Sequence, residues 1–260
     1  METMGRRSVP LCDQSRWVFN RLAGDYLARP AYPDALVDEL SALAGGPGAR
    51  VADVGAGTGH LALPLAARGL CVTALEPARA MLESLEARLG GGLEVVTVHG
   101  SAEATGLPAA SFDLVLFADA VQWVDAELAG REAARLLAPA GTLAVLEATF
   151  ARTPFMDALA ALLSRMNPKA RPRPAGAARQ LLAMAAPRAK PSSRAFQQDA
   201  RLDESGLGSF LRSLSYAGPA LAPGALDALV SEAVLLARAS GGPRLQRDLT
   251  LRWAARRPAS

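Results

Sequence analysis

Residues 50–76 constrain the fold of this chain more than any other stretch. The apolar run VADV at 51–54 is typical of a short buried strand, and the turn GAGTG follows it at 55–59. A segment with helical spacing of apolar residues comes next, and a second apolar run then ends at Glu76. A strand, a glycine turn, a helix and a second strand ending in an acid form the layout of a nucleoside-binding βαβ unit. The stretch therefore predicts an α/β fold with a ligand at the turn.

The turn suits a ligand for three reasons. Gly55, Gly57 and Gly59 lack a Cβ, so the backbone can pass close to a ligand where a side chain would collide. The helix that follows offers unpaired backbone N–H groups to polar or anionic atoms. Glu76, about 20 residues further on, stands where a carboxylate can accept hydrogen bonds from both hydroxyls of a ribose.

The spacing of the glycines separates two classes of cofactor. The dinucleotide fingerprint G-x-G-x-x-G needs its third glycine at position 60, which is His60. The third glycine comes one residue earlier, as G-x-G-x-G. With Asp53 before the turn and Glu76 after it, the pattern resembles the first motif of the class I S-adenosylmethionine (SAM)-dependent methyltransferases. The resemblance implies SAM as the cofactor, and the alternative is a plain strand-to-helix turn.

The composition sets further bounds. The chain has 260 residues, half of them hydrophobic, which suits one α/β domain with an insertion or a cap. Its two cysteines, Cys12 and Cys71, exclude a disulfide framework, so we expect a reducing, cytoplasmic setting. We expect neither a signal peptide nor a membrane span, because no apolar run is long enough. The net charge of +3 does not by itself indicate a nucleic-acid partner.

Strand and helix patterns alternate up to residue 149, which requires parallel strands joined by right-handed crossovers. A Pro/Arg-rich insertion breaks the rhythm, and the segment 246–254 alternates like a final antiparallel strand. We expect a Rossmann-like, mostly parallel seven-stranded sheet with helices on both faces, an N-terminal helical cover and an inserted cap after strand five. The single methyltransferase domain is expected to comprise a helical cover (1–48), a SAM-binding core (49–149), a Pro/Arg-rich helical insertion (150–193), and a C-terminal part of the sheet with a substrate cover (194–260).

The segment YLARPAYP at 26–33 resembles the lead-in of a subfamily that includes the trans-aconitate methyltransferases. In these enzymes N-terminal helices fold over the cofactor pocket. The resemblance implies that Tyr26 and Arg29 lie near the methionine end of the cofactor. The alternative is a tyrosine in the core and a solvated arginine.

The resemblance also implies which residues border the adenine. The family often has an acid at the position of Ser101 that contacts the adenine amine, and this chain departs from that pattern. Recognition of adenine is then expected to depend on backbone groups or on Glu103. The full set of implied cofactor contacts is Arg29, Asp53, Gly55, Ala56, Gly57, Gly59, Glu76, Pro77, Ser101, Ala102, Glu103 and Ala118.

The loop after the fourth strand, residues 118–125, bears on the methyl acceptor. It lacks the Asn/Asp-Pro-Pro-aromatic motif of DNA amino-methyltransferases, and neither cysteine follows a proline, as the cytosine-C5 enzymes require. Gln122 and Trp123 resemble the Gln-Trp pair of the trans-aconitate enzymes, which favours a small acceptor such as a carboxylate. We predict Tyr26, Gln122 and Trp123 at the methyl-transfer end, against the alternative that Trp123 packs the start of a helix.

We therefore predict a methyltransferase that acts by direct in-line transfer to a small molecule, to oxygen first and nitrogen second. Because the sulfonium already activates the methyl group, no catalytic triad and no metal site are expected. For His60 and His99 we favour structural roles over roles as bases. The alternatives are an RNA methyltransferase that uses the basic tract 165–194, a SAM-binding partner subunit without activity, and a nicotinamide-dependent oxidoreductase.

Overall fold

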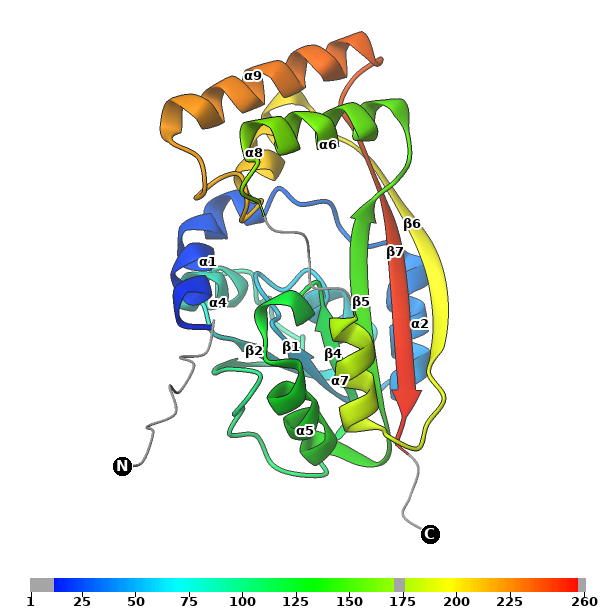
Figure 1. Cartoon of the computed structure of the whole chain (residues 1–260). Coiled ribbons are helices and arrows are strands. Elements are labelled where there is room, and N and C mark those ends of the chain that lie inside the picture. Colours follow the sequence, from blue (N-terminus) through cyan, green and yellow to red (C-terminus); the bar gives the residue numbers. More distant parts are fainter. Residues whose placement is uncertain (1–11, 171–175, 257–260) are drawn as a thin grey trace, which may run out of the picture.

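A single twisted sheet organises the molecule. The computed structural model describes residues 12–170 and 176–256. Its seven strands run in the order β3-β2-β1-β4-β5-β7-β6 (Figure 1). They are β1 (Arg50–Val54), β2 (Cys71–Glu76), β3 (Val95–His99), β4 (Phe112–Ala118), β5 (Leu137–Phe150), β6 (Ser192–Arg201) and β7 (Arg244–Ala255).

The directions of the strands confirm the predicted fold class. The first five strands are parallel to one another, whereas β7 is antiparallel to both β5 and β6. The chain winds outward from β1 to β3, then returns to β4 on the other side of β1. This reversal creates a switch point at the carboxyl ends of β1 and β4, where open α/β sheets bind their ligands.

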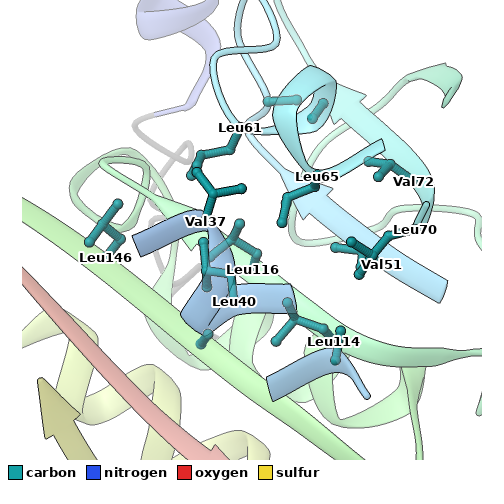
Figure 2. Packing of buried hydrophobic residues seen from close by; sticks show 14 of the residues in the cluster. Val37, Leu40, Val51, Leu61, Leu65, Leu70, Val72, Leu114, Leu116 and Leu146 are labelled. Atoms are coloured by element: carbon teal, nitrogen blue, oxygen red, sulfur yellow. The ribbon is translucent and has the colours of Figure 1, made fainter. Parts of the chain in front are cut away.

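Helices cover both faces of the sheet. They are α1 (Cys12–Tyr26), α2 (Asp34–Ala44), α3 (Ala62–Ala66), α4 (Arg79–Glu86), α5 (Ala126–Leu136), α6 (Pro154–Met166), α7 (Ala177–Ala185), α8 (Glu204–Arg212) and α9 (Pro223–Ala239). On one face α2, α3 and α4 share a core with the strands; Figure 2 shows Val37 and Leu40 of α2 beside Leu116 of β4. On the other face α5 and α7 form a second core.

Local signals explain several helix boundaries. The Asp125 carboxylate accepts hydrogen bonds from the backbone N–H groups of Glu127 and Leu128 and so caps α5. Pro33 precedes the first residue of α2, and Gly45 ends that helix with a φ of +106°. Pro154 occupies the first turn of α6 behind the capping hydroxyl of Thr153.

The insertion after β5 is divided between two places. Helix α6 joins α8 and α9 in a helical layer with its own apolar core, drawn at the top of Figure 1. Helix α7 instead packs on α5, where a Cβ at Gly130 would stand 2.6 Å from the Cβ of Met184. Residues 171–175, within the basic tract, lie outside the described residues, as do 1–11 of the N-terminal cover and the last four residues.

Candidate functional site

The glycine turn lies at the switch point of the sheet. Gly55 and Gly57 have positive φ angles of +79° and +57°, which L-residues rarely adopt. A Cβ on Gly55 would stand 2.9 Å from the Cβ of Ala120, and one on Gly57 would stand 3.6 Å from the ring of Tyr26. A side chain at either position would therefore strain the turn and narrow the space above it.

Gly59 has a different role from the other two glycines. Its φ is +85°, and a Cβ there would stand only 2.3 Å from Cδ1 of Leu85 in α4. Gly59 does not line either of the cavities described below. The glycine is thus required for the close approach of the turn to α4.

Glu76 fixes the turn from the end of β2. Its Oε2 accepts a hydrogen bond from the backbone N–H of Gly57 at 2.9 Å, and its Oε1 accepts one from Ala78 at 2.8 Å. Burial raises the pKa of Glu76, and the two N–H donors partly oppose that shift. Each carboxylate oxygen has acceptor capacity left for a ligand.

Asp53 presents an unsatisfied carboxylate oxygen. The side chain is buried at the end of β1, and its Oδ2 has no hydrogen-bond partner among the described residues. Burial and, secondarily, the charge of Glu76 raise the pKa of Asp53 to about 7, while the N–H of Ala62 acts to lower it. Such an orphaned acceptor costs free energy until a donor or cation pairs with it.

Two cavities meet over the glycine turn. The first, of about 720 Å³, extends over Glu76 to residues 101–103 and 118–120. The second, of about 440 Å³, lies over Asp53 and is lined by Arg29, Pro30 and Tyr32 and by Arg247 of β7. Both are lined by Tyr26, Gly55, Gly57 and Ala118, so they form one elongated cleft.

Helix α1 covers the first cavity. The ring of Phe19 meets that of Trp123 edge-on, with centroids 5.2 Å apart at an interplanar angle of 89°. Trp123 belongs to a short 3-10 helix (Val121–Trp123) that follows β4. Both rings line the first cavity.

Arg29 joins residues 26–33, the lead-in segment, to the helical layer of α6, α8 and α9. Its guanidinium lies 4.0 Å from the centroid of the Tyr26 ring and donates a hydrogen bond to the Tyr26 hydroxyl at 3.2 Å. Its Nε donates to Oγ of Ser213 at 2.9 Å, and Nη2 donates to the Ser213 carbonyl at 3.0 Å. Arg29 therefore lines the second cavity as a fixed, partly buried group rather than a solvated one.

Both histidines are held by hydrogen bonds within the protein. His60 hydrogen-bonds Oγ1 of Thr58 through Nδ1 and the carbonyl of Arg29 through Nε2. Burial, as the main cause, lowers the pKa of His60 to about 4, so the ring is neutral at physiological pH. His99 hydrogen-bonds the carbonyl of Pro77. These contacts support structural roles.

The structure separates the three residues predicted at the methyl-transfer end. Tyr26 lines both cavities and Trp123 lines the first. Gln122 lines neither: its amide donates to the carbonyl of Asp119 at 2.6 Å, and its Oε1 is buried without a partner among the described residues. The predicted cofactor residues divide between the cavities. The first is lined by Gly55, Gly57, Glu76, Pro77, Ser101, Ala102, Glu103 and Ala118; the second is lined by Arg29, Asp53, Gly55, Ala56, Gly57 and Ala118.

Sequence reasoning missed three polar residues of the cleft. Tyr32 and Arg247 line the second cavity, and Asp119 lines the first. Asp119 follows β4 with a φ of +51°, a strained conformation for a residue with a side chain. A signal existed for Arg247, because it stands in phase with Leu249 and Leu251 on the apolar side of its strand.

Three other predicted features can be placed. In the basic tract, Arg165 forms an ion pair with Glu232, and Arg194 forms one with Glu39. In the part of the chain that the structure describes, no three His, Cys, Asp or Glu side chains gather as a metal site. Among the described helices, none has the length and apolarity needed to cross a membrane.

The part of the chain that carries the glycine turn is similar to known methyltransferases. Residues 52–145 match the family model of the methyltransferase domain. The chain is 39% identical over 145 residues to an uncharacterized methyltransferase of Mycobacterium bovis, with 55% of each chain covered. It is 36% identical over 135 residues to a malonyl-[acyl-carrier protein] O-methyltransferase of Geobacter sulfurreducens, with 50% of this chain and 51% of the relative covered. The chain thus spans about half the length of the curated relatives it matches.

Solved structures share the fold at low sequence identity. The YcgJ protein from Bacillus subtilis has a TM-score of 0.57 and 18% identity, covering 87% of this chain and all of its own. The match covers most of the chain, and at this identity it shows the fold alone. It therefore concerns the architecture that carries the site.

Proposed function

We propose that this chain is a class I SAM-dependent methyltransferase that transfers a methyl group from SAM directly to an oxygen of a small-molecule acceptor. The match of residues 52–145 to the methyltransferase-domain model and the similarity to a mycobacterial methyltransferase support this proposal. The acceptor oxygen belongs to a carboxylate or a hydroxyl group. We further propose that the enzyme works in the cytoplasm, in keeping with the free thiol of Cys71.

The lining of the second cavity is the observation that carries the choice of a small acceptor. This cavity lies beside the proposed cofactor site and is lined by polar and charged side chains, Tyr32, Asp53 and Arg247 among them. Tyr26 and Arg29 line it on the side of the lead-in, and the hydrogen bonds from Arg29 to Ser213 tie that side to the helical layer. A small acceptor with oxygen groups suits this polar lining.

The residues of the cleft fit SAM. The glycines at 55 and 57 leave room for the cofactor, and Glu76 offers carboxylate oxygens to the ribose hydroxyls. The orphaned Oδ2 of Asp53 suits the methionine ammonium, directly or through water. Ser101 and residues 102–103 line the far end of the first cavity, where the adenine would lie.

The protein contributes position and the exclusion of water. SAM supplies a methyl group that is already activated on a sulfonium. The new bond uses a lone pair of the acceptor oxygen, while the electrons of the broken carbon–sulfur bond remain on sulfur. Holding the two reactants in line can supply roughly 7–11 kcal/mol of the barrier. A carboxylate acceptor needs no base, whereas a hydroxyl must also lose a proton.

Calorimetric titration of the protein with SAM, S-adenosylhomocysteine (SAH) and NAD tests the cofactor. We expect SAM and SAH to bind and NAD to give no heat, because His60 stands where the dinucleotide turn needs glycine. Binding of NAD alone would overturn the proposal. Binding of SAM without methyl transfer to any small acid or phenol would favour a partner subunit without activity.

Cofactor affinity should depend on pH through Asp53. Its carboxyl is protonated below about pH 7 in the free protein, and pairing with the SAM ammonium requires the charged form. Affinity for SAM should therefore fall as the pH drops through 7, by about tenfold one pH unit below that value.

Two controls isolate this effect. The affinity for 5′-methylthioadenosine, which lacks the amino-acid half, should change little over the same range. Asp53→Asn should bind SAM more weakly and without the pH slope. An unchanged slope in Asp53→Asn would remove the assignment.

A further inference from the structure

Arg247 is a charged residue on the apolar side of β7. It alternates in phase with Leu245, Leu249 and Leu251, which are each at most 1% exposed, and it is itself only 6% exposed. A buried guanidinium loses several kcal/mol of hydration, so it is retained only where it is well paired or where a ligand uses it.

The protein pairs Arg247 incompletely. Nε donates a hydrogen bond to Oε1 of Gln198 at 2.6 Å. Nη1 stands 3.9 Å from Oδ2 of Asp119, which is close enough for electrostatic attraction but too far for a hydrogen bond. A guanidinium has five N–H donors, and among the described residues only the Nε donor is in a hydrogen bond. The other donors belong to a side chain that lines the second cavity.

Gln198 holds the guanidinium in place. Its Oε1 accepts from Arg247, while its Nε2 donates to the carbonyls of Pro30 and Ala31 in the lead-in segment. The plane of the guanidinium is therefore fixed before any ligand arrives. A pre-positioned fork of N–H donors matches the two oxygens of a carboxylate.

Arg247 lies on a different side of the cleft from the residues that we propose to bind the cofactor. Arg247 pairs in register with Phe150 of β5, and β7 is separated from β1 by β4 and β5 (Figure 1). Three strand spacings amount to about 14 Å. The SAM methionine would be anchored over β1 by Asp53, so Arg247 reaches the cavity from the opposite wall.

Tyr32 adds a second donor to this wall. Its hydroxyl makes no hydrogen bond within the described residues, and its ring lines the second cavity with Arg247. Burial, followed by the charge of Asp119, raises the pKa of Tyr32, so the group remains a phenol that can donate.

We propose that Arg247 and Tyr32 form a carboxylate subsite for the methyl acceptor. The guanidinium withdraws electron density from the oxygens it binds, so the carboxylate it holds is not the one that is methylated. The acceptor is then a small acid with a second oxygen group, either a dicarboxylic acid or a hydroxy acid. This inference rests on the proposed function and adds the chemical class of the substrate.

Binding to the SAH-loaded protein tests the subsite without turnover. Succinate, glutarate and malate are titrated by calorimetry, each against its neutral diamide. We expect at least one acid to bind and the diamides to fail. Arg247→Met should weaken that binding about 30- to 100-fold, since it removes a buried, charge-assisted contact. Tyr32→Phe should weaken it by about threefold to tenfold.

Matched variants make the result specific. Arg252→Met removes the same charge from the same strand, where Arg252 is ion-paired with Glu147 outside both cavities, and should leave acid binding unchanged. Arg247→Lys keeps the charge but loses the paired N–H donors of the guanidinium. We therefore expect an intermediate loss of acid affinity, about tenfold, and this variant tests the subsite even if Arg247→Met folds poorly.

The results of these titrations distinguish a failure of the carboxylate subsite from a failure of the proposed function. Loss of SAH affinity in Arg247→Met would assign the arginine to the cofactor and overturn the subsite. Failure of every acid to bind, with SAH still bound, would overturn the subsite and leave the methyltransferase proposal intact. If the wild type does not bind SAH, the proposed function fails, and the same acid titrations on the cofactor-free protein then decide the subsite alone.

Discussion

Replacing Glu76 with alanine is expected to weaken SAM binding about 150- to 25,000-fold. The carboxylate is the acceptor proposed for two ribose hydroxyls, and hydrogen bonds to charged groups contribute about 1.5–3 kcal/mol each. The same change removes the acceptor for the N–H groups of Gly57 and Ala78, so the turn itself is loosened. Calorimetric titration below the melting transition measures the affinity.

Controls separate the contact with the ribose from the loosening of the turn. Glu76→Gln keeps one carbonyl oxygen and should lose less affinity than alanine. Glu94→Ala removes an exposed acid whose partner is the Cys71 thiol, and should leave the SAM dissociation constant unchanged. An unchanged dissociation constant in Glu76→Ala would remove Glu76 from the cofactor site.

Gly59→Ala is expected to destabilise the fold by about 2–4 kcal/mol. The left-handed backbone costs about 1–2 kcal/mol for a residue with a Cβ, and overpacking against Leu85 adds about 1–3 kcal/mol. The midpoint of urea unfolding measures the loss. Gly91→Ala is the control, because a Cβ there meets nothing within 4 Å.

A double-mutant cycle identifies the cause of that loss. Leu85→Ala alone should cost about 2–5 kcal/mol as a cavity in the core. Combined with Gly59→Ala, the total should be less than the sum, because the clash disappears and only the backbone strain remains. Strict additivity would contradict the packing role. The SAM affinity of folded Gly59→Ala should stay close to wild type, since Gly59 lines neither cavity.

The sequence predicted the part of the site whose residues lie close together along the chain. The turn at 55–59 and Glu76 belong to one βαβ unit whose spacing determines both the fold and the glycine positions. Residues 52–145, which contain the turn and Glu76, match the family model of the methyltransferase domain. The parallel direction of β1 to β5 was predicted from the alternation of strands and helices, although the described chain passes from β3 to β4 without a helix.

The side of the cleft that carries Arg247 and Tyr32 is formed by contacts between residues far apart in the sequence, which no local pattern specifies. Arg247 meets Gln198 only because β6 and β7 pair, and Tyr32 reaches the same cavity from a segment over 160 residues earlier. The alternation of β7 did mark Arg247 as a charge on an apolar face, and that signal was readable. The position of Gln122 outside both cavities depends on the local conformation after Asp119, which is strained.

Hydrogen bonds between the lead-in segment and the last third of the chain affect the order in which the parts of the protein fold. Arg29 bonds Ser213, 184 positions later, and Gln198 bonds the Pro30 carbonyl across 168 positions. During synthesis, the strands around the glycine turn emerge and can pair well before either partner exists. The cover over the cleft is therefore completed last, so a nascent chain can display an open cofactor face while the ribosome is still extending it.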